Sequence, residues 1–264
     1  MKVLPSFLFG LCLLLAELPG RGAPPARELY ELKIYHLQTQ AQADRLDRYL
    51  QQAYLPALHR AGVAKVGVFK PRESAEASAA GPAEQLVYVL VPCRSAEQYL
   101  QLAPRLGDDK AYQTAAQDYL GTAFDNPVYA RIETVLLRAF AGQPALQVPA
   151  LKAGPAERVY ELRSYEGASE KLHQNKVDQF NNGEISIFKR LNFNPVFYGQ
   201  VIAGSKMPNL MYLTTFESPR DQEAHWQAFR DDPEWKRLSA LPEYAHNMLR
   251  MDKYLLRPAA YSEL

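Results

Sequence analysis

The chain repeats its own sequence pattern. Tyr30-Glu31-Leu32-Lys33-Ile34-Tyr35 returns 130 positions later as Tyr160-Glu161-Leu162-Arg163-Ser164-Tyr165. Two further blocks match at shorter offsets: Leu86-Val87-Tyr88 with Leu210-Met211-Tyr212 at 124, and residues 131–138 with 250–257 at 119. A constant order with a shrinking offset indicates two copies of one module, the first with a longer loop. We expect such a chain to place its function where the two modules meet.

The N-terminus has a different character. Lys2 precedes an apolar run from Phe7 to Ala16, which is too short to span a bilayer as a helix, and small residues follow at Gly20 and Gly22. This pattern predicts a signal peptide over residues 1–22, and the alternative is a short anchor that is not cleaved. We therefore expect an exported protein, periplasmic or secreted, with no stable membrane insertion after cleavage.

Charge and cysteine content exclude several classes of function. The chain has 30 basic and 29 acidic residues, and removing the signal leaves 28 of each, so no basic surface is available for nucleic acid. Removal of the signal also leaves Cys93 as the one cysteine, which excludes a disulfide within the mature chain. At the end of an apolar strand, Cys93 is expected to be a buried small hydrophobe.

Periodicity predicts the same elements in both copies. Residues 28–37 alternate as a strand does, whereas residues 41–61 carry an apolar stripe at helical spacing, with Pro56 expected to kink the helix or restart it. Gly62 ends this helix, and Asn192 stands at the matching place in the second copy. The remaining expected elements are strands 63–70, 86–91 and 130–140 with helix 95–120, and then a strand at 160, helix 170–191, hairpin 196–216, helix 220–238 and strand 248–256.

Each copy therefore reads strand-helix-strand-strand-helix-strand, which is the ferredoxin-like arrangement with both helices on one face of a four-stranded sheet. The open sheet face must be buried, and a second sheet would cover it. The predicted fold is α+β: two ferredoxin-like (βαββαβ) repeats forming an intrachain dimeric α+β barrel, with the helices outside. The expected boundaries are repeat 1 over 28–140, a linker over 141–157 and repeat 2 over 158–258.

Two segments resemble the NIPSNAP family. They are the strand Tyr160–Tyr165 and the later His225-Trp226-Gln227-Ala228-Phe229-Arg230-Asp231-Asp232-Pro233-Glu234-Trp235-Lys236, whose Phe-x-x-Asp-Pro-Glu-Trp element is the most specific sign. The resemblance extends over both repeats and implies a dimeric α+β barrel, a fold shared with small monooxygenase and dehydratase families. It implies no established reaction. Mitochondrial members are linked to vesicle transport and damaged-organelle signalling, a role that the secretion-type N-terminus does not suit.

The second copy offers the first candidate site. His225 could move a proton and Trp226 could form the stacking wall of a pocket, although both could equally belong to ordinary helix-on-sheet packing. Trp235 is a further ligand-binding candidate; its alternative role is to anchor a helix that begins at Pro233 with Asp232 as its cap. The first copy lacks this proline and tryptophan, so we expect one site rather than two.

Charged residues on the first strand of each copy form a second candidate site. Glu31, Lys33 and Tyr35 share a face, as do Glu161, Arg163 and Tyr165. If this face points into the barrel, the charges either form a ladder with Arg131, Glu133, Arg250 and Asp252, or surround a polar cavity. In the second case Arg163 and Tyr165 would orient a small ligand, with Tyr35 and His36 also in contact.

No histidine pair has metal-ligand spacing, and no glycine-rich phosphate loop or nucleophile elbow is present, so neither a metal nor a cofactor is indicated. We predict a small-molecule-binding barrel whose pocket lies between the second repeat's sheet and helices, with Tyr165 and His225 as catalytic residues if it is an enzyme. Such an enzyme would be a cofactor-independent oxygenase or lyase. The alternative is a non-enzymatic interaction module that acts through an outer helix face or an oligomer interface; a homo-oligomer is left open.

Overall fold

The computed structural model describes residues 26–72 and 85–264, so the predicted signal and most of the loop over 71–84 lie outside the described residues. Among these described residues, eight strands close into a barrel in the order β1-β3-β2-β8-β5-β7-β6-β4. All neighbours are antiparallel. The strands are β1 (Leu29–Leu37), β2 (Gly67–Pro71), β3 (Gln85–Cys93), β4 (Arg131–Ala139), β5 (Val159–Glu166), β6 (Phe197–Ala203), β7 (Asn209–Phe216) and β8 (Arg250–Pro258).

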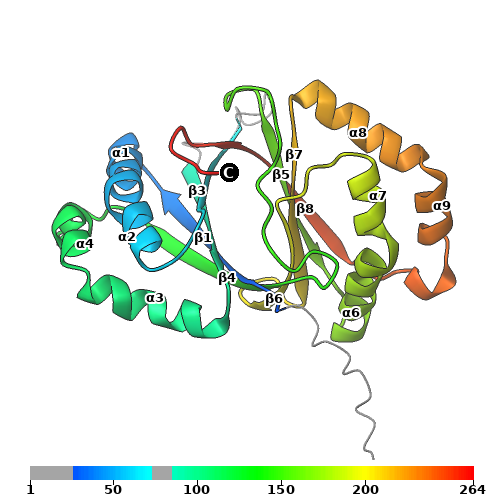
Figure 1. The fold of residues 1–264 in the computed structure, drawn as a ribbon, viewed down its shortest axis with the longest axis horizontal. Coiled ribbons are helices and arrows are strands. Elements are labelled where there is room, and N and C mark those ends of the chain that lie inside the picture. Colours follow the sequence, from blue (N-terminus) through cyan, green and yellow to red (C-terminus); the bar gives the residue numbers. More distant parts are fainter. Residues whose placement is uncertain (1–25, 73–84) are drawn as a thin grey trace, which may run out of the picture.

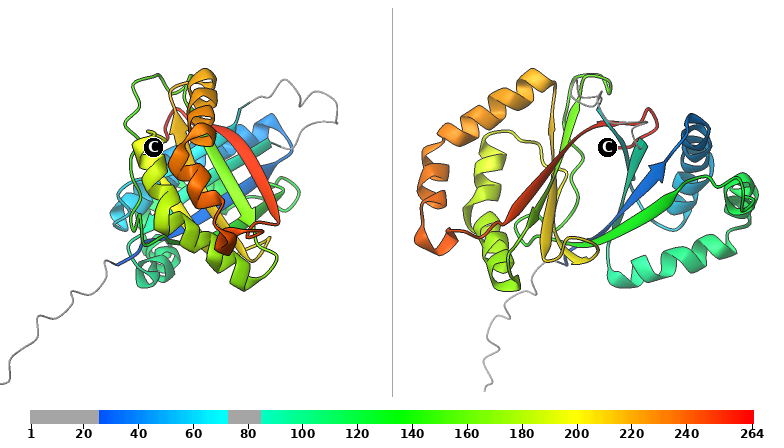
Figure 2. Two further views of the ribbon diagram at one scale, coloured as in Figure 1. Left: turned by 90° about the vertical axis from the view of Figure 1, so that its right-hand side faces the viewer. Right: turned by 180° about the vertical axis from the view of Figure 1, so that it is seen from behind.

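The helices lie outside the barrel in two groups on opposite sides, as Figures 1 and 2 show. The first group is α1 (Gln40–Tyr49), the π-helical turn η1 (Leu50–Tyr54), α2 (Leu55–Arg60), α3 (Ala96–Asp108), α4 (Lys110–Ala115) and α5 (Gln117–Leu120). The second group is α6 (Glu170–Gln179), the π-helical turn η3 (Phe180–Glu184), α7 (Ile185–Arg190), α8 (Pro219–Asp231), α9 (Pro233–Ser239) and the short η4 (Pro242–Tyr244). This is the predicted α+β barrel.

The strand order shows how the barrel closes. Each half supplies four consecutive neighbours, β4-β1-β3-β2 and β8-β5-β7-β6, and the halves join where β2 pairs with β8 and β4 with β6. Within the described residues, each half has the βαββαβ order, so its open sheet face is covered by the sheet of the other half.

Alternation along the strands divides the core into three layers. Tyr30 and Leu32 on β1, with Tyr160 and Leu162 on β5, point into the barrel, which is filled by side chains. Their neighbours in sequence point to the helices instead, where one apolar cluster lies under each helical group. Glu31, Lys33 and Tyr35 therefore face the helices. The conditional placement of this charged face inside the barrel was wrong, because the large apolar residues occupy the interior.

The register corrects the sequence alignment at β3 and β7. Lys33 pairs with Val89, while Arg163, 130 positions later, pairs with Tyr212. The structural offset here is thus 123, not 124. A slip of one residue reverses the face of a strand. Tyr88 accordingly lies in the barrel core and Tyr212 in the core under the second helical group.

Both long predicted helix regions are interrupted at matching places. The π-helical turn η1 precedes Pro56, which stands near the start of α2, and η3 occupies the same position in the second half without a proline. Gly62 follows α2 and Asn192 follows α7, both with positive φ, which agrees with the helix ends predicted at these residues. The later helices break at Asp109 and Asp232, each of which caps the helix that follows.

Cys93 has the environment expected for it. Cys93 is buried and free, and burial raises the pKa of its thiol to about 12, which keeps it protonated. Over residues 26–72 and 85–264, none of the helices has both the length and the apolar character needed to cross a membrane.

Candidate functional site

A half-open cavity of about 550 Å³ lies between the sheet and the helices of the first half. Its floor is formed by Glu31, Lys33 and Tyr35 on β1. Its walls come from the end of α1 and from η1, α3, α4 and α5, and they include the tyrosines Tyr49, Tyr54, Tyr99, Tyr112 and Tyr119. Because each half has the same element order, this position corresponds to the pocket predicted for the second half. The expected pocket type is present, but this cavity lies in the other copy.

The π-helical turn explains how two of these tyrosines reach the same wall. Residues five apart on a regular α-helix do not face one another, whereas an inserted π turn brings them closer together. Tyr49 and Tyr54 accordingly stack with ring centroids 5.6 Å apart. Tyr49 also stacks on Tyr119 at 3.6 Å, and its hydroxyl is 2.9 Å from that of Tyr112. The wall is therefore aromatic and carries phenol hydroxyls.

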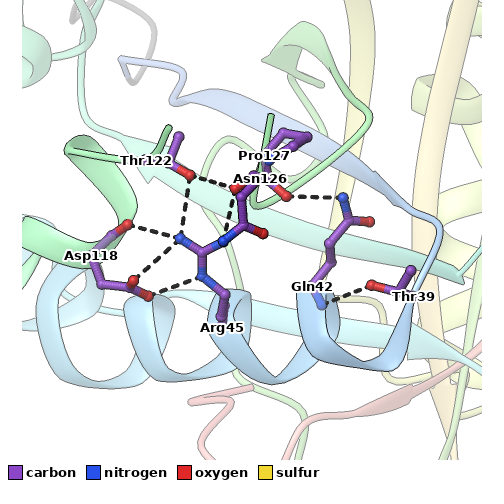
Figure 3. A network of polar contacts seen from close by, with 7 residues as sticks. All are labelled: Thr39, Gln42, Arg45, Asp118, Thr122, Asn126 and Pro127. Atoms are coloured by element: carbon purple, nitrogen blue, oxygen red, sulfur yellow. Dashed lines mark hydrogen bonds and ion pairs between the residues drawn. The ribbon is translucent and has the colours of Figure 1, made fainter. Parts of the chain in front are cut away.

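Arg45 on α1 fixes the α5 side of this wall (Figure 3). Its guanidinium donates to both carboxylate oxygens of Asp118 and to the carbonyl oxygen of Asn126 at 3.0 Å. It also donates to the Thr122 hydroxyl. These bonds hold α5 against α1, which places Tyr119 over Tyr49.

The electrostatic centre of the cavity is Glu31. Its side chain is 9% exposed, and its one ion pair among the described residues is with Lys33, whose Nζ lies 3.6 Å from Oε1. Burial raises the pKa of the Glu31 carboxyl, and Lys33 opposes that rise. Burial also raises the pKa of Tyr35 and Tyr49, so both phenols remain hydrogen-bond donors at neutral pH.

The same register position in the second half is filled. Glu161 accepts hydrogen bonds from Arg163 Nε at 2.5 Å, from Trp226 Nε1 at 2.8 Å and from the Gln222 amide. The Arg163 guanidinium lies 3.6 Å from the centre of the Trp226 ring and donates to the Tyr165 hydroxyl at 3.3 Å. This carboxylate is therefore saturated by protein groups and covered by an indole.

One substitution accounts for much of the difference. Helices α3 and α8 both follow a serine cap, Ser95 or Ser218, whose hydroxyl accepts from the backbone N–H three residues later. Eight residues after these caps stand Ala103 and Trp226. Ala103 lines the cavity, and Trp226 is 7% exposed within the second core. A methyl group thus stands in the first half where an indole fills the second.

The predicted site residues of the second half come together in part. Arg163, Tyr165 and Trp226 are in contact, as expected, but as a packed cluster that lies apart from this cavity. His225 packs edge-on against Phe193 and Phe216, with Nδ1 2.8 Å from the carbonyl oxygen of Asp221.

Trp235 lies in the helix start predicted for it. Asp232 accepts from the backbone N–H groups of Glu234 and Trp235, and the Trp235 ring packs on Phe229 with centroids 4.4 Å apart. Arg190 donates two bonds to the same Asp232 carboxylate. These contacts match the anchoring role that was the alternative for Trp235.

Tyr35 and His36 separate onto opposite faces of β1. Tyr35 lines the 550 Å³ cavity, whereas His36 lines a smaller one of about 200 Å³ on the barrel side. There His36 Nε2 lies 3.0 Å from Glu133 Oε1, which also accepts from Arg131. The predicted ladder is thus replaced by short pairs along and between neighbouring strands.

In the part of the chain that the structure describes, no group of three or more His, Cys, Asp or Glu side chains could hold a metal ion. The chemistry available in the cavity comes from a carboxylate, an ammonium group and phenols. Sequence reasoning missed the tyrosines of η1, α4 and α5, since helical tyrosines near an apolar stripe predict core. Their number was the available signal: 16 tyrosines in 264 residues.

Comparison with known proteins agrees with this architecture. The family model described as NIPSNAP matches residues 160–263. This match lies within the second half of the chain. No curated protein matches the sequence. Among solved structures, a NIPSNAP family protein of unknown function from Agrobacterium tumefaciens is 19% identical and covers 42% of this chain and 97% of its own, with a TM-score of 0.38.

Two longer structures resemble the whole barrel. A putative monooxygenase from Lactobacillus acidophilus is 12% identical, covers 90% of this chain and 98% of its own, and has a TM-score of 0.56. A putative monooxygenase from Fusobacterium nucleatum is 7% identical, covers 88% and 93%, and has a TM-score of 0.55. At these identities the likeness is one of fold, and it extends over both the segment that matches the family model and the half that precedes it.

Proposed function

We propose that the chain binds a small, flat organic molecule with a hydroxyl or carbonyl group in the tyrosine-lined cavity of the first half. The observation that carries this proposal is the contrast between the two halves: one buried carboxylate faces a cavity, and its counterpart is covered by Trp226. Aromatic walls with a few convergent polar groups are typical of ligand sites. Cofactor-independent catalysis at this site is part of the proposal.

The test is to fill the cavity with the side chain that the second half uses. Ala103→Trp should lower affinity for a bound ligand by at least about tenfold, because the indole would take the ligand's place. Small hydrophobic acids, quinols and aromatic aldehydes are the first compounds to screen by thermal shift, and hits are then measured by calorimetry. Leu241→Trp, at a residue 38% exposed on the second half, is the matched control and should bind as the wild type does.

Two outcomes would contradict this proposal. One is a screen in which no compound of these classes raises the melting temperature. The other is unchanged affinity in an Ala103→Trp protein that is folded by circular dichroism.

A second candidate function is protein interaction through the second half. Leu249 and Met251, next to the start of β8, are 58% and 45% exposed, and Met248 beside them is 43% exposed. Adjacent exposed apolar side chains favour a contact surface. Light scattering tests this: a stable oligomer that Leu249→Ser and Met251→Ser dissociate would support it, and a monomer at all concentrations would oppose it.

We also propose that the two halves arose by duplication and that the chain is exported. The matching helix caps, breaks and strand register support duplication. Export rests on the sequence of residues 1–22 alone. N-terminal sequencing of the mature protein tests it, with cleavage after Gly22 as the expected result and an intact Met1 as the contrary one.

A further inference from the structure

Glu31 and Glu161 occupy the same register position but have different capacities to accept a proton. Glu161 already accepts hydrogen bonds from three side chains. Glu31 has Lys33 alone as its ion-pair partner among the described residues, and it borders a cavity. Lone pairs that are free of protein donors and face a ligand space are what a general base requires.

The groups around Glu31 could stabilise the anion that remains after a ligand has given a proton to this carboxylate. Removal of a proton beside a carbonyl leaves negative charge on the carbonyl oxygen. Lys33 and the phenols of Tyr35 and Tyr54 border the same cavity and can stabilise such an oxyanion by charge and hydrogen bonds. Lys33 Nζ itself lies 5.5 Å from the centre of the Tyr54 ring. An acceptor and several donors thus share one partly water-excluded space.

The lining also limits the size and shape of the ligand. A cavity of about 550 Å³ with stacked tyrosines on one wall accommodates a flat molecule of one to three rings. Leu100 and Leu120 line it as well and are 64% and 47% exposed, so the approach from solvent is apolar. An uncharged, lipophilic compound fits this approach better than a strongly charged one.

We infer that Glu31 accepts a proton from a carbon atom next to the carbonyl group of a small aromatic or conjugated ketone held in this cavity. This inference rests on the proposed function of the same site. The C–H bond breaks and the proton moves to a Glu31 carboxylate oxygen. The C–H electron pair forms a carbon–carbon double bond, and the π pair of the carbonyl group moves onto its oxygen to give the enolate. Return of the proton to carbon closes the cycle, so the step needs no oxidant, reductant or further reactant.

The experiment measures hydrogen exchange on a probe ketone. 2-Tetralone is a flat bicyclic ketone whose C1 hydrogens are acidic, and in deuterated buffer their loss is followed by proton NMR. The wild-type protein should accelerate this exchange in a saturable manner. Glu31→Gln should still bind 2-tetralone, while its rate of catalysed exchange falls at least about a hundredfold, a typical contribution of a general base.

Glu133→Gln provides the matched control. This carboxylate lies on β4, in the same half, but borders the barrel-side cavity. Its removal should leave the exchange rate unchanged. Ala103→Trp should abolish both binding and exchange, which links the reaction to the cavity itself.

The possible results separate this inference from the proposed function. Binding of 2-tetralone without faster exchange would overturn the proton transfer and leave ligand binding intact, as would a Glu31→Gln protein that exchanges at the wild-type rate. Failure of 2-tetralone to bind where acids or quinols do bind would overturn the ketone class. Failure of every compound would remove the proposed function as well.

Discussion

At the scale of single residues, the two halves differ through side-chain size more than through backbone. Ala103 and Trp226 stand at the same place on α3 and α8, and the charged residues beneath them are a glutamate with lysine or arginine in each case. The indole both fills space and donates to Glu161. A single small residue is therefore sufficient to leave a buried carboxylate without this donor.

Asp232 gives a prediction that depends on pH. Arg190 holds the pKa of this carboxyl below its usual range, with further help from the backbone N–H groups at the start of α9. Because the pKa is lower in the folded state, the stabilisation is present above the unfolded value near about pH 4 and is lost as pH falls below it. Asp232→Asn keeps a capping oxygen but removes this charge, so its stability should decline less steeply between about pH 4 and pH 2 than that of the wild type.

Urea unfolding across this pH range provides the measurement. Asp232→Ala removes the cap as well, and it should cost about 0.5–2 kcal/mol at neutral pH. Equal acid sensitivity of the wild type and Asp232→Asn would contradict the role assigned to the Arg190 pair.

At the scale of elements, the cavity depends on how α5 is held. Helix α5 has four residues and would not be stable alone, so its position follows from the bonds of Arg45. These bonds span α1, α5 and the loop before β4 (Figure 3). The part of the aromatic wall that carries Tyr119 is thus held in place by one side chain.

Arg45→Ala should loosen this wall. We expect the free energy of unfolding to fall by about 1–3 kcal/mol, since a largely buried guanidinium loses several bonds to charged and carbonyl oxygens. Hydrogen–deuterium exchange should rise over residues 117–128, and ligand affinity should fall. Arg48→Ala, at an exposed position on the same helix, serves as the control, and identical exchange in the two variants would contradict this role.

The sequence predicted the elements well because their signals are local. Alternation marked β1, and Gly62 and Asn192 marked the ends of α2 and α7. The sequence did not predict which side chains of β7 point into the barrel. The loop before this strand differs in length between the two halves, and a shift of one residue moves every side chain to the opposite face of the sheet. The π-helical turns could not be predicted from the sequence either. One inserted residue changes which tyrosines lie on the same side of the helix, but it leaves the apolar composition of the segment as it would be in a regular helix.

The cavity itself depends on two elements packed together. Ala103 is compatible with both a filled core and an open space, and only the position of β1 beneath it decides between them. The charged and phenolic groups of this strand face were therefore predictable from residues 31–35. The sequence did not predict which of the two halves has a cavity over that face.

At the scale of the whole molecule, each half closes the other. Residues that follow β8 continue along β2, where Ala259 N–H donates to the Val68 carbonyl oxygen and Glu263 N–H to that of Val66. Leu264 is 5% exposed and lies in the barrel core, close to Gly67. The second half thus seals the end of a strand that belongs to the first.

Leu264→Ala should test this seal. Removal of a buried leucine side chain is expected to cost about 2–5 kcal/mol and to lower the melting temperature of the entire barrel in one transition. Leu241→Ala, at a more exposed leucine, should cost much less. Two separate transitions, with the second half unaffected, would show that the halves unfold independently.

Joining both sheets in one polypeptide has an evolutionary consequence. In a homodimer of two identical chains, every mutation is present twice. A mutation that enlarges the cavity of one subunit also enlarges the same cavity of the other, and both subunits lose stability. Here a change at position 103 leaves position 226 untouched. The first half can therefore evolve to bind a new ligand while the second half keeps its packed core. Selection can act on ligand recognition without lowering the stability of the opposite half.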